Sequence, residues 1–507
     1  MPESPPMSLP DAYEAFADHH RESSLLQSCA SLLSWDQETH MPKGGAGNRA
    51  QQLTLLSGMV HRRQTSEEYG ELLAAAEDCG LIADEHPAAA ANLRVARRDY
   101  DRSRRIPPAL VEEKTGATVL ARRAWVDARA NDDFPSFRPH LERIFDLSRQ
   151  IAEAIGSESG DPYDALLDAY EPYATAEGIE AVFAPLREAH ISLLDRILGS
   201  DRSVDVRMLH RDFPQRAQAA LAREAGSAIG FDFERGRIDE TAHPFCMAIS
   251  PDDVRLTVRY ERDFFNPAFF GLLHEAGHGM YAQGLPAKQH GLPAGTACSF
   301  GIHESQSRLW ENLVGRSRAF WRWCYPKAQE AFPEALVNVA EEDFYRAINE
   351  VKPSLIRVEA DEVTYNLHVM LRFELERALL SGELDAGDLP GAWNETFEKY
   401  LRISPDNDAD GCLQDIHWSA GLIGYFPTYT LGNVYAAQIY EAAERDLGEL
   451  EPQFERGEFK PLKEWLNRNI HDHGQIHPPR ELVEVVTGSP PHHDALVRQL
   501  ESKYLRS

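Results

Sequence analysis

The segment "LLHEAGHGMY", residues 272–281, carries two histidines and a glutamate in the spacing H-E-x-x-H. On a helix, residues i and i+4 project from one face, so His274 and His278 can offer ring nitrogens to one ion. Glu275 is next to the first histidine, where its carboxylate could accept a proton from water on that ion. The pattern predicts a metal hydrolase centre, and a chance match in a buried helix is the alternative.

A catalytic zinc ion needs a third protein ligand and one open position for water. Glu304 in "GIHESQSRLWEN" opens another helical pattern and offers a carboxylate, which such centres commonly use. Its neighbour His303 could compete as the ligand. His290 in "AKQHGLPAG" is a weaker rival because it lies in a segment rich in glycine and proline. Spacing leaves all three candidates open.

The elements that must position these residues are mostly helices, because apolar residues recur at three- and four-residue steps. Such patterns cover residues 11–35, 67–79, 108–130, 178–198, 214–230, 363–380, 430–447 and 459–470. The best strand candidate is "DVRLTVRY", residues 253–260, in which apolar and polar residues alternate. A strand edge beside the metal would let an extended peptide add as a further strand, whereas the alternative is a structural hairpin. With short turns and no long linker, we expect one catalytic domain over residues 1–507, with residues 1–7 as a flexible tail.

The composition limits the possible partners and compartment. The formal net charge is −29, which repels phosphate backbones and anionic lipid, so we expect neither nucleic acid nor membrane as a partner. The N-terminus lacks the basic and apolar segments of a signal peptide, and no apolar run is long enough to span a membrane. Six dispersed cysteines without a C-x-x-C pair suit free thiols in a reducing compartment. We therefore expect a cytoplasmic protein.

Five motifs in order extend the pattern far beyond the two histidines. They are "DVRLT" (253–257), "HEAGH" (274–278), "HESQS" (303–307), "IRVEAD" (356–361) and "GCLQDIHW" (411–418), followed by "GYFPTYTLGN" (424–433). Through these motifs the chain resembles the carboxypeptidase Taq family of metallocarboxypeptidases from about residue 10 to about residue 505. The family-like segments "LLSWDQETHMP", "DPYDALLDAYEP" and "HPF" support the resemblance.

The resemblance implies a mainly α, neurolysin-like helical fold with a deep active-site groove and a small β-sheet beside the metal. It implies a homodimeric enzyme that removes single residues from peptide C-termini, with broad specificity and poor cleavage at proline. It implies His274, His278 and Glu304 as ligands of one divalent metal, zinc by default with cobalt or manganese possible, and Glu275 as the general base.

The remaining motifs supply candidates for substrate binding and transition-state stabilisation. Arg357 looks like the family's arginine that recognises a free C-terminal carboxylate, and the alternative is a salt bridge to Glu359, Asp361 or Glu362. Arg255 is a competing anchor, and His243 in "HPF" is a further substrate-binding candidate.

A tetrahedral intermediate needs a hydrogen-bond donor beside the metal, for which His417, Tyr425 and Tyr429 are candidates, with packing as their alternative role. Asp415 could fix the tautomer of His417, and Asp361 could do the same for a metal ligand.

Two other functions fit the same metal pattern. An endo-acting metallo-oligopeptidase would use the same ligands and base but would cut internal peptide bonds. A non-catalytic scaffold stabilised by metal would need the ligands but not Glu275, so the glutamate argues against it.

Overall fold

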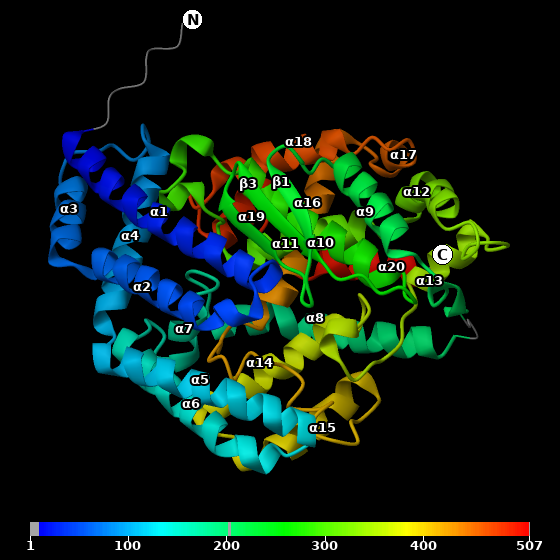
Figure 1. The fold of residues 1–507 in the computed structure, drawn as a ribbon, viewed down its shortest axis with the longest axis horizontal. Helices are drawn as coiled ribbons and strands as arrows, with labels where there is room; N and C mark the ends of the chain where they lie inside the picture. The colour runs from blue at the N-terminus through cyan, green and yellow to red at the C-terminus, as the bar shows by residue number, and fades with distance from the viewer. Residues whose placement is uncertain (1–9, 201–203, 506–507) are drawn as a thin grey trace, which may run out of the picture.

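The computed structural model describes residues 10–200 and 204–505, so the predicted tail at residues 1–7 lies outside the described residues. The chain is mainly helical with one small sheet (Figure 1). This outcome confirms the predicted fold class. None of the helices in the described ranges has the length and apolarity needed to cross a membrane.

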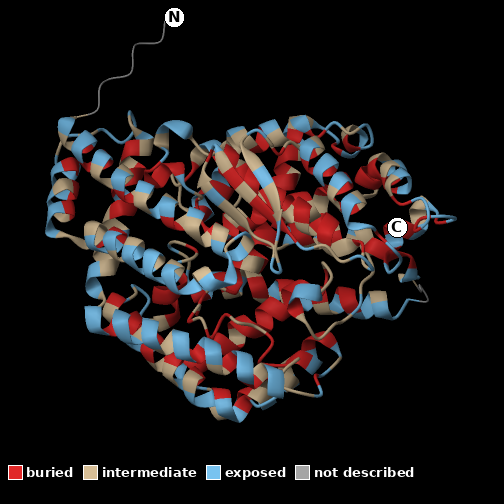
Figure 2. Cartoon of the chain, viewed as in Figure 1, coloured by how far each residue is buried: buried red, intermediate tan, exposed pale blue. Residues whose placement is uncertain are grey.

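The N-terminal part of the chain consists of helices only. They are α1 (Asp11–Thr39), α2 (Ala46–Thr65), α3 (Glu67–Glu77), α4 (Pro87–Arg105), α5 (Pro108–Asn131), α6 (Phe134–Ile155), α7 (Pro162–Leu167) and α8 (Ala176–Leu198). Helix α1 packs on α2 and α3, and α5 packs on α6. A separate small apolar core, which includes Phe16, Tyr69 and Leu93, joins α1, α3 and α4. In Figure 2 the outward faces of α1, α2 and α5 are largely exposed.

The sheet lies beside the helix that carries the H-E-x-x-H motif. After α9 (Gln215–Ile229) come β1 (Gly236–Glu240), β2 (Cys246–Ser250), β3 (Asp253–Val258) and α10 (Asn266–Gly284). The strand order is β1-β3-β2, with β1 parallel and β2 antiparallel to β3. The alternation in the sequence is confirmed, because Val254, Leu256 and Val258 are fully buried and α10 packs against β3.

The sequence did not predict which place in the sheet this strand would take. Because β3 is the central strand, both of its edges are paired and it has no free edge for a peptide. The edges of the sheet are β1 and β2, and the thiol of Cys246 in β2 lies close enough to Glu275 for that carboxylate to influence its pKa. A substrate that extends the sheet beside the metal would therefore add to β2.

The C-terminal part surrounds α10 with further helices. They are α11 (Phe300–Arg308), the π-helix η5 (Leu309–Val314), α12 (Arg318–Ala331), α13 (Glu341–Ile348), the 3-10 helix η6 (Arg357–Glu359), α14 (Tyr365–Ser381), α15 (Leu389–Leu401), α16 (Pro427–Leu447), α17 (Glu451–Phe454), α18 (Lys460–Asn469), α19 (Pro479–Thr487) and α20 (Asp494–Leu505). Helix α11 lies between α10 and α16, and these three helices belong to the large buried core that Figure 2 shows in red.

Candidate metal centre

Two helices bring the three predicted ligands together. Helix α10 starts with Pro267 in its first turn, a position where proline costs no hydrogen bond, and it carries His274 and His278. Helix α11 is capped by Ser299, whose hydroxyl accepts from the backbone N–H of Ile302 at 3.0 Å. It carries Glu304, which is five residues beyond this cap.

The ligand atoms of His274, His278 and Glu304 all lie within 4.8 Å of one another. Oε2 of Glu304 is 3.7 Å from Nε2 of His274 and 3.5 Å from Nε2 of His278. Two imidazoles and one carboxylate around a common point form a donor set that fits a divalent metal with an open position.

Glycines allow this close approach of the helices. A Cβ at Gly277 in α10 would lie 2.5 Å from the carbonyl oxygen of Gln306 in α11. A Cβ at Gly432 in α16 would lie 2.5 Å from Cγ of Glu304. Glu304 is therefore placed between two helices that only glycine lets approach so closely.

Hydrogen bonds orient both imidazoles. Nδ1 of His274 is 2.9 Å from Oε2 of Glu311, and Nδ1 of His278 is 3.0 Å from the carbonyl oxygen of His303. Both partners are acceptors, so in the neutral ring each Nδ1 carries the proton and each Nε2, which lies toward Glu304, has the lone pair. This is the tautomer that a metal ligand requires.

His303, the rival candidate ligand, is not part of this cluster. Its ring stacks on that of His278, with centroids 4.1 Å apart, and its carbonyl accepts the Nδ1 proton of that residue. Burial holds the pKa of His303 well below its ordinary value, so the ring is neutral. His290 ends a 3-10 turn elsewhere in the chain and is not in the cluster that forms among the described residues.

Arginines keep the carboxylates of the centre ionised. Burial would raise the pKa of Glu304, but Arg308 and the two histidines bring it well below its ordinary value. Nε of Arg308 donates to Oε1 of Glu304 at 2.7 Å, and its Nη1 lies 3.3 Å from Glu311. Burial would also raise the pKa of Glu311, but Arg308 and His274 lower this pKa to about 2.

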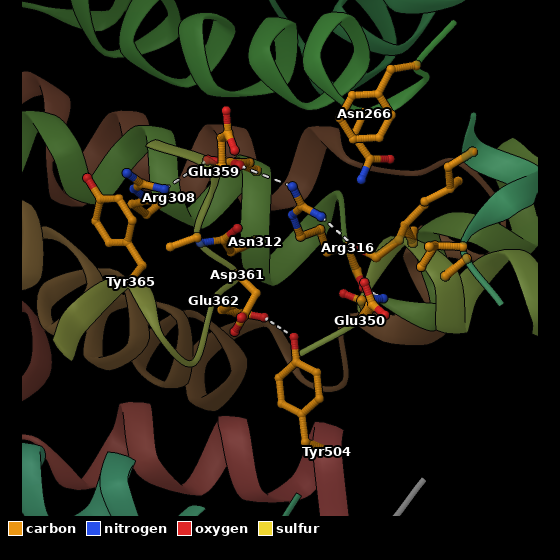
Figure 3. Close-up of a pocket in the computed structure, with 18 of the residues that line it drawn as sticks. Asn266, Arg308, Asn312, Arg316, Glu350, Glu359, Asp361, Glu362, Tyr365 and Tyr504 are labelled. Atoms are coloured by element: carbon orange, nitrogen blue, oxygen red, sulfur yellow. Dashed lines mark hydrogen bonds and ion pairs between the residues drawn. The ribbon is translucent and has the colours of Figure 1, made fainter. Parts of the chain in front are cut away.

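Arg308 and Glu311 also line a polar cavity of about 200 Å³ on the Nδ1 side of His274. Arg316 projects into the same cavity (Figure 3). It forms an ion pair with Glu311, with 3.5 Å between Nη2 and Oε1. Tyr365 also lines the cavity, and the guanidinium of Arg308 lies 4.3 Å from the centre of its ring. The cavity thus lies behind the ligands, on the side away from the shared point of the two Nε2 atoms.

Glu275 is buried beside the ligands and is separate from the trio. Burial raises the pKa of its carboxyl above the ordinary value, and the imidazoles of His274 and His278 act against this rise. A carboxylate with a raised pKa is the more effective proton acceptor of the site.

Arg357 sits in a buried network that the sequence had not shown. Its Nε and Nη2 donate to Oδ1 of Asp415 at 3.1 and 2.7 Å, and its Nη1 is 3.0 Å from the hydroxyl of Tyr365. Arg372 donates to the other oxygen of Asp415 at 2.6 Å. The ion pair of Arg357 is therefore with Asp415, and the alternative partners Glu359, Asp361 and Glu362 were wrong.

His417, Tyr425 and Tyr429 form one aromatic cluster. Nε2 of His417 is 3.1 Å from the hydroxyl of Tyr429, whose ring lies 5.3 Å from that of Tyr425. Burial lowers the pKa of His417 to about 4 and raises that of Tyr425 to about 12, so both are neutral near pH 7. Asp415 does not fix the tautomer of His417, because 3.7 Å between them is too long for a hydrogen bond.

A buried carboxylate fixes the segment that carries this cluster. Glu376 in α14 accepts from Nε1 of Trp418 at 2.9 Å, the backbone N–H of Gly424 at 3.1 Å and the hydroxyl of Tyr163 at 2.8 Å. These contacts hold the chain immediately after His417 and immediately before Tyr425. Burial raises the pKa of Glu376 to about 7.

The two other substrate-binding candidates lie on the sheet. Arg255 pairs with Asp253 at 2.8 Å and stacks on Trp35 of α1 at 4.2 Å. His243 is exposed in the loop between β1 and β2. Neither forms a hydrogen bond or ion pair with the three ligand residues in the part of the chain that the structure describes.

Sequence reasoning missed the partners of the ligands. Asp361 was a candidate for orienting a metal ligand. Its carboxylate instead accepts hydrogen bonds from the backbone N–H and the hydroxyl of Thr364, at the start of α14. Glu311 orients His274 instead. The sequence carried no clear signal for this contact, because Glu311 lies in the π-helix that follows α11 and not in a regular α-helical turn.

Known proteins match this chain over nearly its whole length. The family described as carboxypeptidase Taq (M32) metallopeptidase matches residues 15–504. Thermostable carboxypeptidase 1 of Thermus thermophilus is 49% identical over 97% of this chain and 98% of its own length. Carboxypeptidase 1 of Bacillus subtilis is 38% identical over 96% and 97%. The crystal structure of the M32 carboxypeptidase from Deinococcus radiodurans R1 superposes with a TM-score of 0.94, at 42% identity over 98% of this chain and 99% of that one. The chain therefore belongs to the carboxypeptidase Taq (M32) family of metallopeptidases, and the predicted class, a metal-dependent carboxypeptidase, is confirmed.

Proposed function

We propose that this chain releases single C-terminal residues from peptides, with broad specificity and poor cleavage at proline. One divalent metal, zinc by default with cobalt or manganese as substitutes, would be held by His274, His278 and Glu304. The observation that supports this assignment is the pair of fixed tautomers, which leaves both Nε2 lone pairs free beside Oε2 of Glu304. Residues 1–507 would act as a single catalytic domain.

The bound ion would polarise the scissile carbonyl and make water acidic enough to attack at neutral pH. Glu275 accepts the proton of the attacking water and passes it to the leaving amine. The hydroxyl of Tyr429 or Tyr425, or the ring N–H of His417, donates to the developing oxyanion. Because His417 and the tyrosines are neutral near pH 7, each can donate a hydrogen bond without adding charge.

Arg357 is proposed to bind the terminal carboxylate. Three of its five N–H groups take part in the hydrogen bonds to Asp415 and Tyr365, which leaves two for a substrate. The buried group of Arg357, Arg372 and Asp415 holds two positive charges and one negative charge. A buried excess positive charge is unfavourable, and a substrate carboxylate would compensate it. Arg255 and His243 stay weaker candidates for substrate binding.

Ladder sequencing by mass spectrometry tests the proposal. One unblocked peptide is incubated with the purified protein in zinc, in cobalt and after chelation. Sequential loss of C-terminal residues that stops on chelation supports the exopeptidase. Cleavage of an internally quenched peptide with a blocked C-terminus would instead support the endo-acting oligopeptidase, and absence of cleavage with metal bound would support the scaffold.

Two further properties are part of the proposal. We infer a cytoplasmic location from the six free thiols, all of which lie within the described residues. We infer a homodimer, for which Val119, Leu120 and Val126 offer an exposed apolar surface on α5. Sedimentation velocity at several concentrations tests the dimer.

A further inference from the structure

A second cavity lies beside His303, at the N-terminal end of α11. Its volume is about 280 Å³, and its walls include Tyr170, Pro172, Ala297, Phe300 and His303. Phe300 is the first residue of α11, and 46% of its surface is exposed, which is unusual for a large aromatic residue. We call this cavity the Phe300 pocket. Its volume is near the lower end of the range for ligand sites, which starts at about 300 Å³, and so suits one side chain better than a whole peptide.

The Phe300 pocket is connected to the candidate active site at two points. The ring of His303, which lines the pocket, stacks on the metal-ligand candidate His278. The rings of Phe300 and Tyr170 lie 5.3 and 5.2 Å from that of Tyr425. A side chain in the pocket would therefore lie beside both the ligands and the candidate oxyanion donors.

A row of aromatic rings gives the direction of a bound peptide. Tyr425 contacts Phe300 at one end and Tyr429 at the other, with centroids 5.3 Å apart in both pairs. The guanidinium of Arg357 lies 4.9 Å from the ring of Tyr429. The pocket and Arg357 are thus at opposite ends of this row. If Arg357 holds the terminal carboxylate, the residue on the acyl side of the scissile bond points toward the pocket.

We propose that the Phe300 pocket binds the side chain of the penultimate substrate residue and selects large apolar or aromatic side chains there. This inference rests on the proposed carboxypeptidase function and on Arg357 as the carboxylate anchor. The aromatic walls supply apolar area, which favours an apolar side chain. Arg98 also lines the pocket, and its Nη1 is buried without a hydrogen-bond partner among the described residues. Its Nε and Nη2 donate to Asp99 at 2.9 and 2.8 Å, so this guanidinium is already paired. A cationic penultimate residue would lose its hydration in the apolar pocket without gaining a partner there, and would be disfavoured.

Three N-blocked dipeptides with a free C-terminal alanine provide the test, with Phe, Ala or Lys as the penultimate residue. The expected order of kcat/KM is Phe over Ala by about tenfold or more, as for side chains that fill an apolar pocket, with Lys lowest. In the variant Phe300→Ala the preference for Phe over Ala should fall at least about threefold. The ratio cancels any loss of activity that affects all three substrates. Leu55→Ala, which removes an exposed apolar side chain from α2, is the control and should leave the ratio unchanged.

A second variant, in which a larger side chain fills part of the pocket, tests the assignment even if Phe300→Ala loses activity on all substrates. Ala169 is exposed and lines the pocket, so Ala169→Leu should narrow it without disturbing the core. The variant should lose activity on the Phe substrate and keep it on the Ala substrate. Equal rates for Phe and Ala in the unmodified protein, or an unchanged ratio in both variants, would overturn the pocket assignment while the carboxypeptidase stands. Failure to release alanine from any substrate would overturn the proposed function instead.

Discussion

Alanine at position 277 should weaken metal binding, whereas alanine at position 271 of the same helix should not. A Cβ at Gly277 would lie 2.5 Å from the carbonyl oxygen of Gln306 and 2.6 Å from Cα of Ser307. Both contacts are with backbone, which cannot rotate away. An ordinary contact starts at 3.4 Å, so α10 and α11 would have to separate locally by about 0.9 Å. At Gly271 nothing lies within 4 Å of the added Cβ.

Both substitutions gain the higher helix propensity of alanine, but only Gly277→Ala also suffers from overpacking. Alanine in place of glycine inside a helix stabilises by up to about 1 kcal/mol, which is the whole expected effect of Gly271→Ala. Overpacking at Gly277 costs about 1–3 kcal/mol, so Gly277→Ala should change the free energy of unfolding by between zero and a loss of about 2 kcal/mol.

The effect on the site should be larger than the effect on stability. A separation of about 0.9 Å moves Glu304 on α11 away from His274 and His278 on α10. The residues of a functional site must stay within about 0.5 Å of their productive positions. We expect the zinc affinity to fall by about 10–100-fold, the range seen when the groups that support metal ligands are changed.

Competition with a chromogenic chelator measures the zinc affinity of the two variants, and urea unfolding with chelator present measures their stability. A zinc affinity of Gly277→Ala within about twofold of that of Gly271→Ala would contradict this role of Gly277. An equal loss of affinity in both variants would contradict it as well, since the effect would then come from any alanine in this helix.

Three other predictions concern glutamates. Glu275→Gln should lower kcat at least about 100-fold with metal retained by elemental analysis, because proton transfer is lost while the ligands stay; loss of metal would point to a structural role. Glu311→Gln should weaken zinc binding about 10–100-fold, because the acceptor for Nδ1 of His274 loses its charge; an unchanged affinity would contradict the role given to Glu311. Burial raises the pKa of Glu376 to about 7, above about 4.3 for the unfolded chain, so its protonated form stabilises the fold fully below about pH 4.3 and this contribution is lost progressively as the pH rises from there through 7. The free energy of unfolding should therefore fall by about 1 kcal/mol from this group between about pH 6 and pH 8.5, and urea titrations should show a smaller fall in Glu376→Gln.

The sequence was sufficient for the parts of the molecule that depend on local pattern. The predicted helical segments correspond to α1, α3, α5, α8, α9, α14, α16 and α18. Val254, Leu256 and Val258 are buried on one face of β3, as their alternation predicted. The motif at His274–His278 lies on a helix, so the two imidazoles share a face. Each of these features depends on residues a few positions apart, for which the geometry of a helix or strand is known in advance.

Contacts between distant segments could not be read in the same way. Asp415 is 58 residues from Arg357, and several acidic residues closer to that arginine were the natural partners in the sequence. Gly277 looked like an unremarkable position between two ligands, and only the packing of α11 shows why a side chain is excluded there. The helix that contains Glu376 was predicted from the sequence. Nothing in the sequence indicated that Glu376 would contact the segment next to His417.

The π-helix after α11 explains both the missed partner of His274 and the charge of the centre. Between Leu309 and Val314 the angle per residue differs from that of an α-helix, so a regular helical projection from Glu304 misplaces Glu311. In the structure Arg308 bridges Glu304 and Glu311, and Arg316 reaches Glu311 from the other side.

This arrangement sets the net charge around the ligands. Glu275, Glu304 and Glu311 carry three negative charges when ionised, and Arg308 and Arg316 carry two positive ones, which leaves one negative charge. A divalent ion would turn this into one net positive charge. Without the two arginines the three carboxylates would more than neutralise the ion and weaken its pull on a carbonyl oxygen. The π-helix that hid Glu311 from the sequence thus also brings together the arginines that preserve this positive charge.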